Sequence, residues 1–542
     1  MEDRLDHVLS RPLTRRAALR ASLVSLGVAS LAAACSGGGA ASPTAAPAAA
    51  TTAPAKPAAT TAPAATTAPP AATTAPAAAT TAPAATTAAA ATAAPAAAGT
   101  TPQAAPTFTK ATINGKFAVV QSRDFHPDHN ALIEKSIKNF AQQQGYELDH
   151  SYIDAYAGAG DVVQKLTAAV QSGDAPDVLI HTLGSSQLHF LDIIEEVDAL
   201  EMDLEKDQGK AAAAFERAHR LEGKWWAIPH FSRAGGYWVR QSAFKDAGID
   251  PMNDLTDFDK LRDAALKVSK PDKEIWGWGM TANRSGDGDT TVRDAVMQRG
   301  GQVTDESGEI VVLNKDPYRQ YAVAALTFLK ETYTDPKYAS MLPPGVGSWT
   351  DPSNNEAWLA GKIALTNNAG TVFAKGVVDK NPVADDTYLI MQPKGTGPGG
   401  KALMGAGAAM CFFVMKGAKN RDAAEQLIRY LSSPAIYKQM FQISTGYVYP
   451  ARQWGWDQPE ITQSKYAQHV TANWRKIFDD PSGFLGTSYP AQPAPQLDAL
   501  DNSNFWTDMF GEVLGGKSPE DAVKSAHDRV VKTFKEFGAK GE

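Results

Sequence analysis

The chain has 542 residues and a formal net charge of −7 at pH 7, with 52 Lys and Arg against 59 Asp and Glu. This acidic balance excludes a nucleic-acid-binding protein, because such proteins need a cationic face for phosphates. The two cysteines, Cys35 and Cys411, cannot form a disulfide framework.

The first 34 residues have the pattern of an export signal. Arginines in the stretch Thr14–Arg20 precede the uncharged residues 21–34, which are too few to span ~30 Å of hydrocarbon as a permanent helix. The stretch Thr14–Arg20 resembles a twin-arginine signal, although Ala18 stands where Phe is usual. Export by the twin-arginine route and by the general secretory route both stay open.

A lipidation site follows the export signal. The segment Leu31–Gly37 resembles a lipoprotein cleavage site, which predicts that the thiol of Cys35 carries a diacylglyceryl group. A plain secretory signal with an incidental cysteine is the alternative. The lipid would anchor the exported chain to the membrane, at the cell surface or in the periplasm.

Residues 35–107 are almost entirely Ala, Thr and Pro, and Lys56 is their one charged residue. Such a segment has too little apolar surface to offset the entropy of ordering the chain. Its prolines favour extended polyproline II segments. We therefore expect a disordered tether between Cys35 and a folded body.

The folded body begins with alternating strands and helices. The expected elements are a strand at 117–120, a helix at 132–141 ended by Gly145, a strand at 147–153, a helix at 162–170 and a strand at 177–180. This order predicts a parallel sheet with right-handed crossovers. Further helices are expected at 318–332 and 422–431, and the apolar run around Cys411 predicts a buried strand.

Several chemical motifs are weak or absent. The loop 121–129 contains no glycine and the glycine-rich stretch 395–400 precedes no expected helix, which argues against a dinucleotide site. His126 and His129 could ligate a metal, but Pro127 between them also suits the start of a helix. The Asp287-Gly-Asp motif hints at calcium without the EF-hand spacing. We expect no metal and no cofactor.

The order of several longer segments carries a family resemblance. The segments are 223–230, 236–249, 357–370, 405–414, 420–433 and 445–450. Together they resemble the maltose-binding-like family of extracellular solute-binding proteins, which are lipoproteins or periplasmic proteins that serve ABC importers. The resemblance covers most of residues 112–542.

The resemblance implies an α/β protein with the two-lobed type II periplasmic-binding-protein fold and a hinge between the lobes. The N-terminal lobe would comprise 108–231 with 405–450, and the C-terminal lobe 232–404 with 451–542. A monomer of this kind would close on a small solute and dock on a membrane permease. It would not be an enzyme, although a secreted carbohydrate-active enzyme with paired carboxylates stays an alternative.

Sugars need planar polar side chains for their hydroxyls and an aromatic platform for their C–H faces. The candidate ligand-binding residues are Asp124, Phe125, His181, Gly184, Ser185, Phe231, Arg233, Trp278, Asn367, Asn368, Gly405 and Tyr447. Trp278 could instead belong to the core of a lobe. Arg233 could face the cleft or pair with a carboxylate of a lobe.

A neutral sugar or oligosaccharide is the expected ligand. Arg123, Arg233 and Arg284 could instead grip an anionic solute through bidentate bonds. Asp124 and aromatic faces could instead hold a cation such as a polyamine. A lipoprotein that only scaffolds a surface complex is a further alternative.

Overall fold

The computed structural model describes residues 106–154, 159–405, 408–444, 446–466, 469–470, 474 and 484–542. The predicted export signal, Cys35 and all but the last two residues of the predicted tether lie outside this part of the chain. Within the described residues, no helix combines the length and the apolar character needed to cross a membrane.

A six-stranded sheet organises the first part of the body, with the strand order β12-β6-β11-β3-β1-β2. Its strands are β1 (Phe117–Arg123), β2 (Leu148–Asp154), β3 (Val178–His181), β6 (Ile228–Arg233), β11 (Ala408–Val414) and β12 (Val448–Pro450). β1 pairs in parallel with β2 and β3, which confirms the predicted parallel arrangement. β11 runs antiparallel to β3 and β6, and β12 runs antiparallel to β6.

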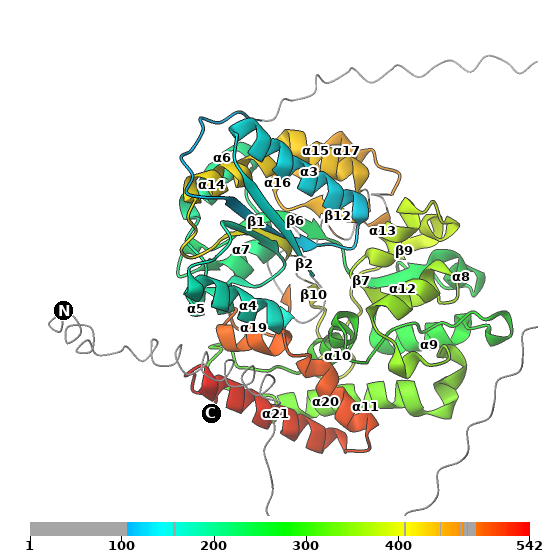
Figure 1. Ribbon diagram of the computed structural model, residues 1–542. Helices are drawn as coiled ribbons and strands as arrows, with labels where there is room; N and C mark the ends of the chain where they lie inside the picture. The colour runs from blue at the N-terminus through cyan, green and yellow to red at the C-terminus, as the bar shows by residue number, and fades with distance from the viewer. Residues whose placement is uncertain are drawn as a thin grey trace, which may run out of the picture. The chain divides into compact units, whose positions relative to one another are not determined.

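Helices cover both faces of this sheet (Figure 1). They are α3 (Pro127–Gln144), α4 (Ala159–Ser172), α5 (Ser185–Phe190), α6 (Asp198–Gln208), α7 (Ala213–His219), α14 (Arg421–Leu431), α15 (Pro434–Ile443), α16 (Gln453–Trp456) and α17 (Pro459–Thr462). The short strands β4 (Arg220–Leu221) and β5 (Lys224–Trp225) form a hairpin after α7.

The predicted end of the first helix is confirmed. Gly145 caps α3 in the left-handed conformation with φ 64°, which glycine adopts without steric cost. At the other end, the side chain of His126 accepts a hydrogen bond from the backbone N–H of His129, and Pro127 occupies the first turn. The helix-start interpretation of this histidine pair is therefore confirmed.

A three-stranded sheet organises the second part, with the order β8-β7-β9. Its strands are β7 (Gly236–Arg240), β8 (Leu365–Asn368) and β9 (Thr387–Leu389), and β7 runs antiparallel to both neighbours. The α-helices here are α8 (Gln241–Asp246), α9 (Phe258–Val268), α10 (Gly286–Gln298), α11 (Tyr318–Thr334), α12 (Asp351–Leu359), α13 (Thr371–Val378), α19 (Pro495–Asp501), α20 (Phe505–Leu514) and α21 (Pro519–Glu536). Short 3-10 helices are η2 (Pro271–Lys273), η3 (Pro336–Met341), η4 (Val346–Ser348) and η5 (Pro382–Asp386).

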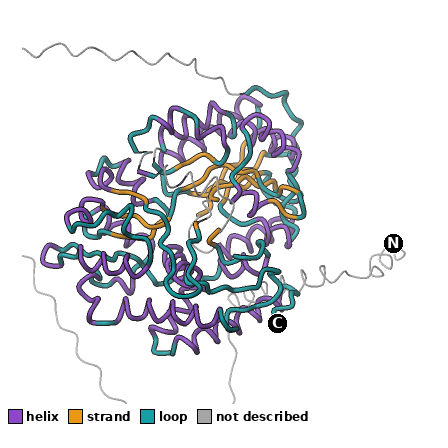
Figure 2. Tube along the Cα trace, turned by 180° about the vertical axis from the view of Figure 1, so that it is seen from behind, coloured by secondary structure: helices purple, strands orange, loops and turns teal. Residues whose placement is uncertain are grey.

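In the described part of the chain, two segments lead from one sheet to the other. β6 ends at Arg233 and β7 begins at Gly236, so two residues carry the chain from the large sheet to the small one. β10 (Met404–Gly405) pairs in parallel with β13 (Phe484–Leu485) just before β11 returns to the large sheet. Figure 2 shows the strands of both sheets inside the body, with helices around them.

Two hydrophobic clusters hold these sheets. The first cluster packs around the six-stranded sheet and contains Cys411, which is fully buried as its apolar run predicts. It also contains Trp238 and Trp474, so it extends past the predicted lobe boundaries at 231/232 and 450/451, which stay predictions. The second cluster lies among α9, α10, α11, α20 and α21 and contains Trp278 and Trp506.

Candidate functional site

Three polar side chains meet where the chain leaves the six-stranded sheet. Asp124 follows β1, Arg233 ends β6 and Tyr447 precedes β12, so all three lie at the edge where the parallel strands β1 and β3 end. We call these three residues the crossing cluster. In open α/β sheets, ligands bind outside this carboxyl edge.

The crossing cluster is closed by hydrogen bonds among its own members. Arg233 Nη1 lies 3.2 Å from Asp124 Oδ1 and donates to the Tyr447 hydroxyl at 2.9 Å. The Tyr447 hydroxyl in turn donates to the same oxygen of Asp124. The side chain of Asp124 is 1% exposed and that of Arg233 is 12% exposed, so this ion pair is mostly shielded from water. Pairing with a carboxylate, one of the two alternatives for Arg233, is what the structure shows.

Histidines and aromatic rings surround the crossing cluster without adding charge to it. Burial lowers the pKa of His129 to about 4 and the pKa of His230 well below its usual value, so both imidazoles are neutral at pH 7. The ring of Phe231 is fully buried and lies 4.8 Å from the His129 ring in an edge-to-face contact. Because Arg233 and Asp124 carry opposite charges, the crossing cluster is neutral overall.

The candidate residues after β3 are engaged inside the protein. His181 ends β3, and its Nδ1 accepts a hydrogen bond from the backbone N–H of Thr182 at 2.8 Å. Ser185 is fully buried, with its hydroxyl 2.8 Å from Nδ1 of His219. Gly184 precedes α5, and the carboxylate of Asp498 lies directly against it.

The two asparagines of β8 also have partners within the protein. Asn367 donates to Asp294 at 3.3 Å, and Asn368 donates to Asp287 Oδ2 at 2.9 Å. The oxygen of the Asn368 side chain accepts from the hydroxyl of Thr371 at 2.8 Å. These amides tie the end of the small sheet to helices α10 and α13, which gives them a positioning role.

The carboxylates of the Asp287-Gly-Asp motif face different partners. Asp287 Oδ2 accepts from Asn354 and Asn368, each at 2.9 Å, whereas Asp289 Oδ1 accepts from the backbone and the hydroxyl of Thr507. The two carboxylates therefore do not form the calcium site that the motif suggested. Among the described residues, no group of three or more His, Cys, Asp and Glu side chains could hold a metal ion.

The remaining candidates lie in three different environments. Trp278 is 1% exposed within the second cluster, and its indole N–H donates to the Tyr333 hydroxyl at 3.2 Å. Of the two alternatives for Trp278, the structure therefore shows a core residue. Gly405 lies in β10 and pairs with Leu485. Phe125 is half-buried beside the crossing cluster, and its backbone N–H donates to Asp124 Oδ1 at 2.7 Å.

Two contacts near this edge involve residues that sequence reasoning missed. The indole N–H of Trp474 donates to the Ser232 hydroxyl at 3.1 Å, next to Arg233. Asp498 Oδ2 accepts from the backbone N–H of Gln187 at 3.0 Å. Each contact joins residues more than 200 positions apart, and neither Trp474 nor Asp498 lies in a motif that would have singled it out.

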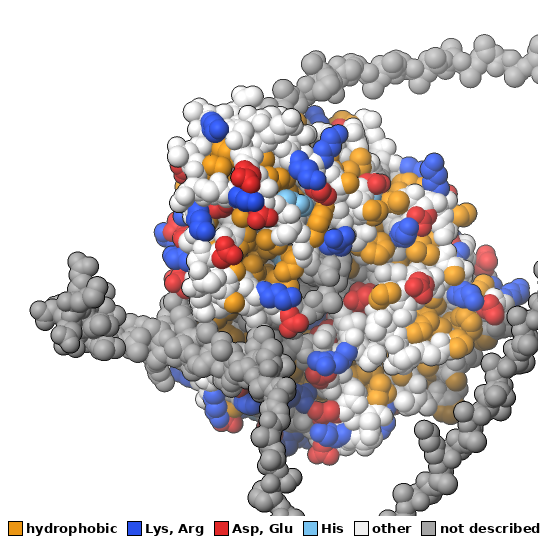
Figure 3. Space-filling model, in the orientation of Figure 1, with side chains coloured by type: hydrophobic (Ala, Val, Ile, Leu, Met, Phe, Trp, Pro, Cys, Tyr) orange, Lys and Arg blue, Asp and Glu red, His pale blue; other side chains and the backbone are white. Residues whose placement is uncertain are grey.

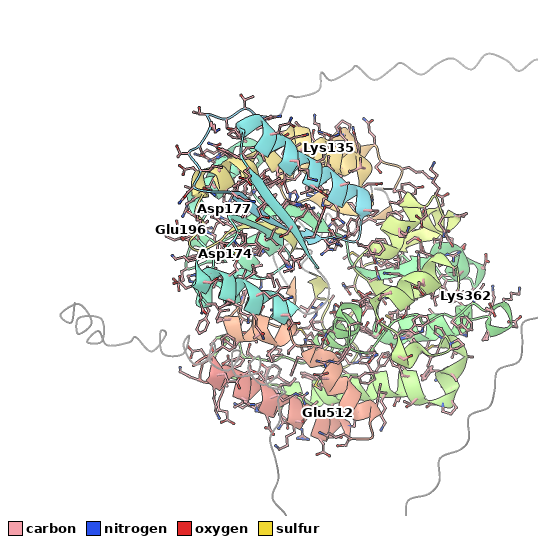
Figure 4. The ribbon with its side chains drawn as sticks, viewed as in Figure 1. Lys135, Asp174, Asp177, Glu196, Lys362 and Glu512 are labelled. Atoms are coloured by element: carbon pink, nitrogen blue, oxygen red, sulfur yellow. The ribbon has the colours of Figure 1, made fainter. Side chains whose placement is uncertain are left out.

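A cavity of about 870 Å³ lies elsewhere, between β1, β2 and α4. Figure 3 shows hydrophobic side chains gathered on this face, and Asp174 and Asp177, which line the cavity, are labelled in Figure 4. Its lining includes residues that precede β1 and β3, and none of the candidate ligand-binding residues contributes to it. We therefore place the candidate site at the crossing cluster and not in this cavity.

A family model identifies the family of the chain. The model of the bacterial extracellular solute-binding protein family matches residues 126–438, which is more than half of the chain. The chain belongs to this family. The expectation of a binding protein instead of an enzyme is thereby confirmed, because the members of this family bind solutes.

Solved structures of similar proteins agree on the fold. A solute-binding protein of Thermotoga lettingae bound to α-D-tagatose is 18% identical, with a TM-score of 0.59 over 78% of this chain and 100% of that one. Maltose-bound MalE3 of T. maritima is 19% identical, with a TM-score of 0.61 over 76% of this chain and 99% of that one. A sugar transporter protein of Arthrobacter chlorophenolicus with bound laminaribiose is 18% identical, with a TM-score of 0.61 over 77% and 99%.

At these identities the likeness establishes the fold. It confirms the predicted two-lobed α/β fold of the type II periplasmic binding proteins. No curated protein sequence matches the chain.

Proposed function

We propose that this family member is an exported lipoprotein that captures a neutral sugar or a similar polyhydroxyl solute between two lobes and delivers it to an ABC importer. The observation that carries the proposal is the neutral, hydrogen-bonded crossing cluster at the passage between the two sheets. The solved relatives with bound tagatose, maltose and laminaribiose support the solute class.

The partners of the arginines favour a neutral ligand over an anion. Arg233 is paired with Asp124, and Arg284 is an exposed residue that pairs with Asp508 at 3.0 Å. The guanidinium of Arg123 lies 4.7 Å from the centre of the Tyr152 ring. Three guanidinium groups with three different partners do not make the convergent set that an anionic solute needs.

The same ion pair argues against a cationic ligand. A polyamine would require an uncompensated carboxylate, and Asp124 already faces Arg233 and the Tyr447 hydroxyl. Replacing Arg233 by the ammonium group of a ligand would leave a guanidinium without its carboxylate in a poorly hydrated place, which is costly.

The proposed function assigns the parts of the chain to two lobes and a tether. The proposed N-terminal lobe comprises 108–231 with 405–450, and the proposed C-terminal lobe comprises 232–404 with 451–542. The predicted lipid on Cys35 and the tether 35–107 would keep this monomeric receptor near its permease and raise its effective concentration there.

A sugar panel tests the solute class. We would titrate mono- and disaccharides into the purified chain while following Trp fluorescence and the melting temperature. A sugar at 100 times its dissociation constant should stabilise the protein by about 2.7 kcal/mol, and its affinity should hardly change between low and high salt.

Two variants sharpen this test. Arg233→Met should lower the affinity for the sugar. Arg284→Ala, which removes an exposed guanidinium, should bind the sugar with the affinity of the wild type. A ligand whose affinity falls steeply with salt, or that is a phosphorylated compound or a polyamine, would replace the sugar proposal with the corresponding charged solute. A chain that responds to no small solute would point to the scaffold alternative.

The two cysteines offer a matched test of anchoring. Cys35→Ala should release the exported protein from the membrane fraction, because a diacylated cysteine gives stable attachment. Cys411→Ala should leave the protein in the membrane fraction, since Cys411 is buried in β11. Retention of the Cys35→Ala variant in the membrane would contradict the lipoprotein proposal.

A further inference from the structure

The short helix α5 contacts residues that belong to the other hydrophobic cluster. Leu188 of α5 is fully buried in the first cluster, around the six-stranded sheet. Leu497 and Leu500 of α19 are buried in the second cluster. Figure 1 shows α5 above and to the left of α19, at some distance from the passage between β6 and β7.

Hydrogen bonds join the two helices. Asp498 Oδ2 accepts from the backbone N–H of Gln187 at 3.0 Å. The side chain of the same glutamine accepts at its Oε1 from Nδ2 of Asn502 at 3.0 Å. Next to them, Arg217 of α7 donates to the backbone oxygen of Ala491. One turn of α5 and one arginine thus contact residues 491–502.

A ring contact widens the interface. The ring centre of Phe190, at the end of α5, lies 5.3 Å from that of Phe537, just beyond α21. Between these contacts lies a cavity of about 350 Å³ that is lined from both sides. Its lining includes Ser186 and His189 from α5, and Gln492 and Pro493 from the segment before α19. The interface therefore combines polar and apolar contacts and leaves a cavity between them.

Gly184 is the residue that permits this close approach. A Cβ atom at position 184 would lie 2.9 Å from Asp498 Oδ2 and 3.1 Å from its carboxyl carbon. Gly184 has φ −72° and ψ 144°, an ordinary extended conformation, so its backbone does not require glycine. The space taken by the Asp498 carboxylate is what requires it.

We propose that the contact of α5 with residues 491–502 is a latch that holds the two lobes together before any solute binds. The inference rests on the hinged, two-lobed receptor of the proposed function. Hydrogen bonds of this kind are exchanged for bonds to water when the lobes separate, so their net contribution is modest and the latch can open. Because the latch covers Gly184, a solute reaches this end of the site only when the latch is open.

The latch would set the balance between open and closed receptor. If the latch holds most molecules closed, only the remaining open molecules can take up a solute. The apparent affinity is then the affinity of the open form multiplied by the fraction of molecules that are open. Removing the latch would enlarge the open population without touching the crossing cluster.

Distance measurements between two spin labels test the latch without any ligand. One label is placed at Asp174→Cys in the first lobe, an exposed position labelled in Figure 4. The other is placed at Lys517→Cys, an exposed residue that pairs with Glu512 at 2.7 Å. The full chain carries Cys35→Ser as well, and the native Cys411 is buried and should not react.

Without ligand, the otherwise wild-type chain should give a short distance. Asp498→Ala removes the acceptor and Gly184→Ala pushes the carboxylate away, so both should shift the distribution to longer distances. Asp498→Asn keeps an oxygen acceptor at the same place and should retain the short distance. Gly511→Ala is the matched glycine control, because a Cβ at that position in α20 meets nothing within 4 Å.

The outcomes separate clearly. If Asp498→Ala and Gly184→Ala both keep the wild-type distribution, or if the wild type already shows the long distance, the latch does not exist. Should Asp498→Ala fail to fold by circular dichroism, Gly184→Ala decides alone. Since no solute is present, a failed sugar titration would contradict the proposed function and leave this result unchanged.

Discussion

The argument for a neutral ligand depends on the ion pair between Arg233 and Asp124. A double-mutant cycle can measure the coupling energy of this pair. Arg233→Met removes the guanidinium and keeps an unbranched apolar side chain in place of the aliphatic part of the arginine. Asp124→Asn removes the carboxylate charge with little change in shape. If the pair is formed as the structure shows, the two substitutions must be strongly coupled.

The expected magnitude follows from burial. Breaking a buried ion pair by removing one partner costs about 3–5 kcal/mol, because the other charge is left without compensation. Asp124 is 1% exposed and keeps the Tyr447 hydroxyl and the backbone N–H of Phe125 as donors, so we expect a loss near 3 kcal/mol for Arg233→Met. The double variant has no buried charge, and it should recover about 1–2 kcal/mol of that loss.

Urea unfolding followed by Trp fluorescence provides the four free energies of the cycle. The matched control is the exposed pair of Arg284 and Asp508, for which coupling should be about 0–1 kcal/mol. If the effects of Arg233→Met and Asp124→Asn add to within about 0.5 kcal/mol, the pair is not formed in solution. Arg233 would then carry an uncompensated charge at the site, and the argument for a neutral ligand would fail.

Two further substitutions test packing and charge away from this pair. Trp278→Ala should destabilise the protein by about 3–5 kcal/mol in urea unfolding, because it leaves a cavity at a core position. The same variant should keep the sugar affinity of the wild type. A variant of normal stability that binds the sugar more weakly would show that Trp278 is a stacking platform for the ligand. Glu201→Gln should cost about 3–5 kcal/mol in the same assay, because Arg452 would keep a buried charge without its carboxylate, whereas Lys465→Gln in the exposed pair with Asp385 should cost less than about 1 kcal/mol. Equal losses for Glu201→Gln and Lys465→Gln would show that burial does not govern these pairs.

Local patterns in the sequence predicted the local structure well. Apolar periodicity predicted the first helix, and a single glycine predicted its end at Gly145. A helix often ends in a left-handed residue, and glycine is the residue that most readily adopts this conformation. The continuous apolar run around Cys411 predicted a buried strand for a similar reason, since a strand with both faces covered has no polar alternation.

Three of the candidate site residues lie together because each stands at the end of a strand of one sheet. Asp124 follows β1, Arg233 ends β6 and Tyr447 precedes β12, and the structure brings their side chains together. The partners of Ser185 and Asn368 could not be predicted from the sequence. The type of a polar residue does not indicate whether its side chain faces a ligand or a buried neighbour, as Ser185 faces His219. Asp498 meets Gln187 across 311 residues, a pairing that no local pattern encodes.

Asp287 illustrates how such an unpredicted contact controls stability through pH. Its carboxylate accepts from Asn354 and Asn368 and so joins α10 and α12 to the end of β8. Burial, reinforced by the nearby carboxylate of Asp351, raises the pKa of Asp287 to about 8. The folded protein therefore binds this proton more tightly than the unfolded chain, in which an Asp has a pKa of about 3.9.

The sign of the pH effect follows directly. The stabilisation from the protonated Asp287 is fully present below about pH 4, decreases as the pH rises toward 8 and is lost above that value, with a slope of at most about 1.4 kcal/mol per pH unit for one group. Asp287→Asn cannot ionise, so its stability relative to the wild type should increase between pH 5 and pH 9 in urea unfolding. The exposed control Asp528→Asn should show no such trend over that range, because the hydrogen bond from Lys524 lowers the pKa of Asp528 and keeps it ionised throughout. If the difference between wild type and Asp287→Asn is the same at pH 5 and pH 9, Asp287 is already ionised in the folded protein, and the two amides of Asn354 and Asn368 hold a carboxylate instead of a carboxylic acid.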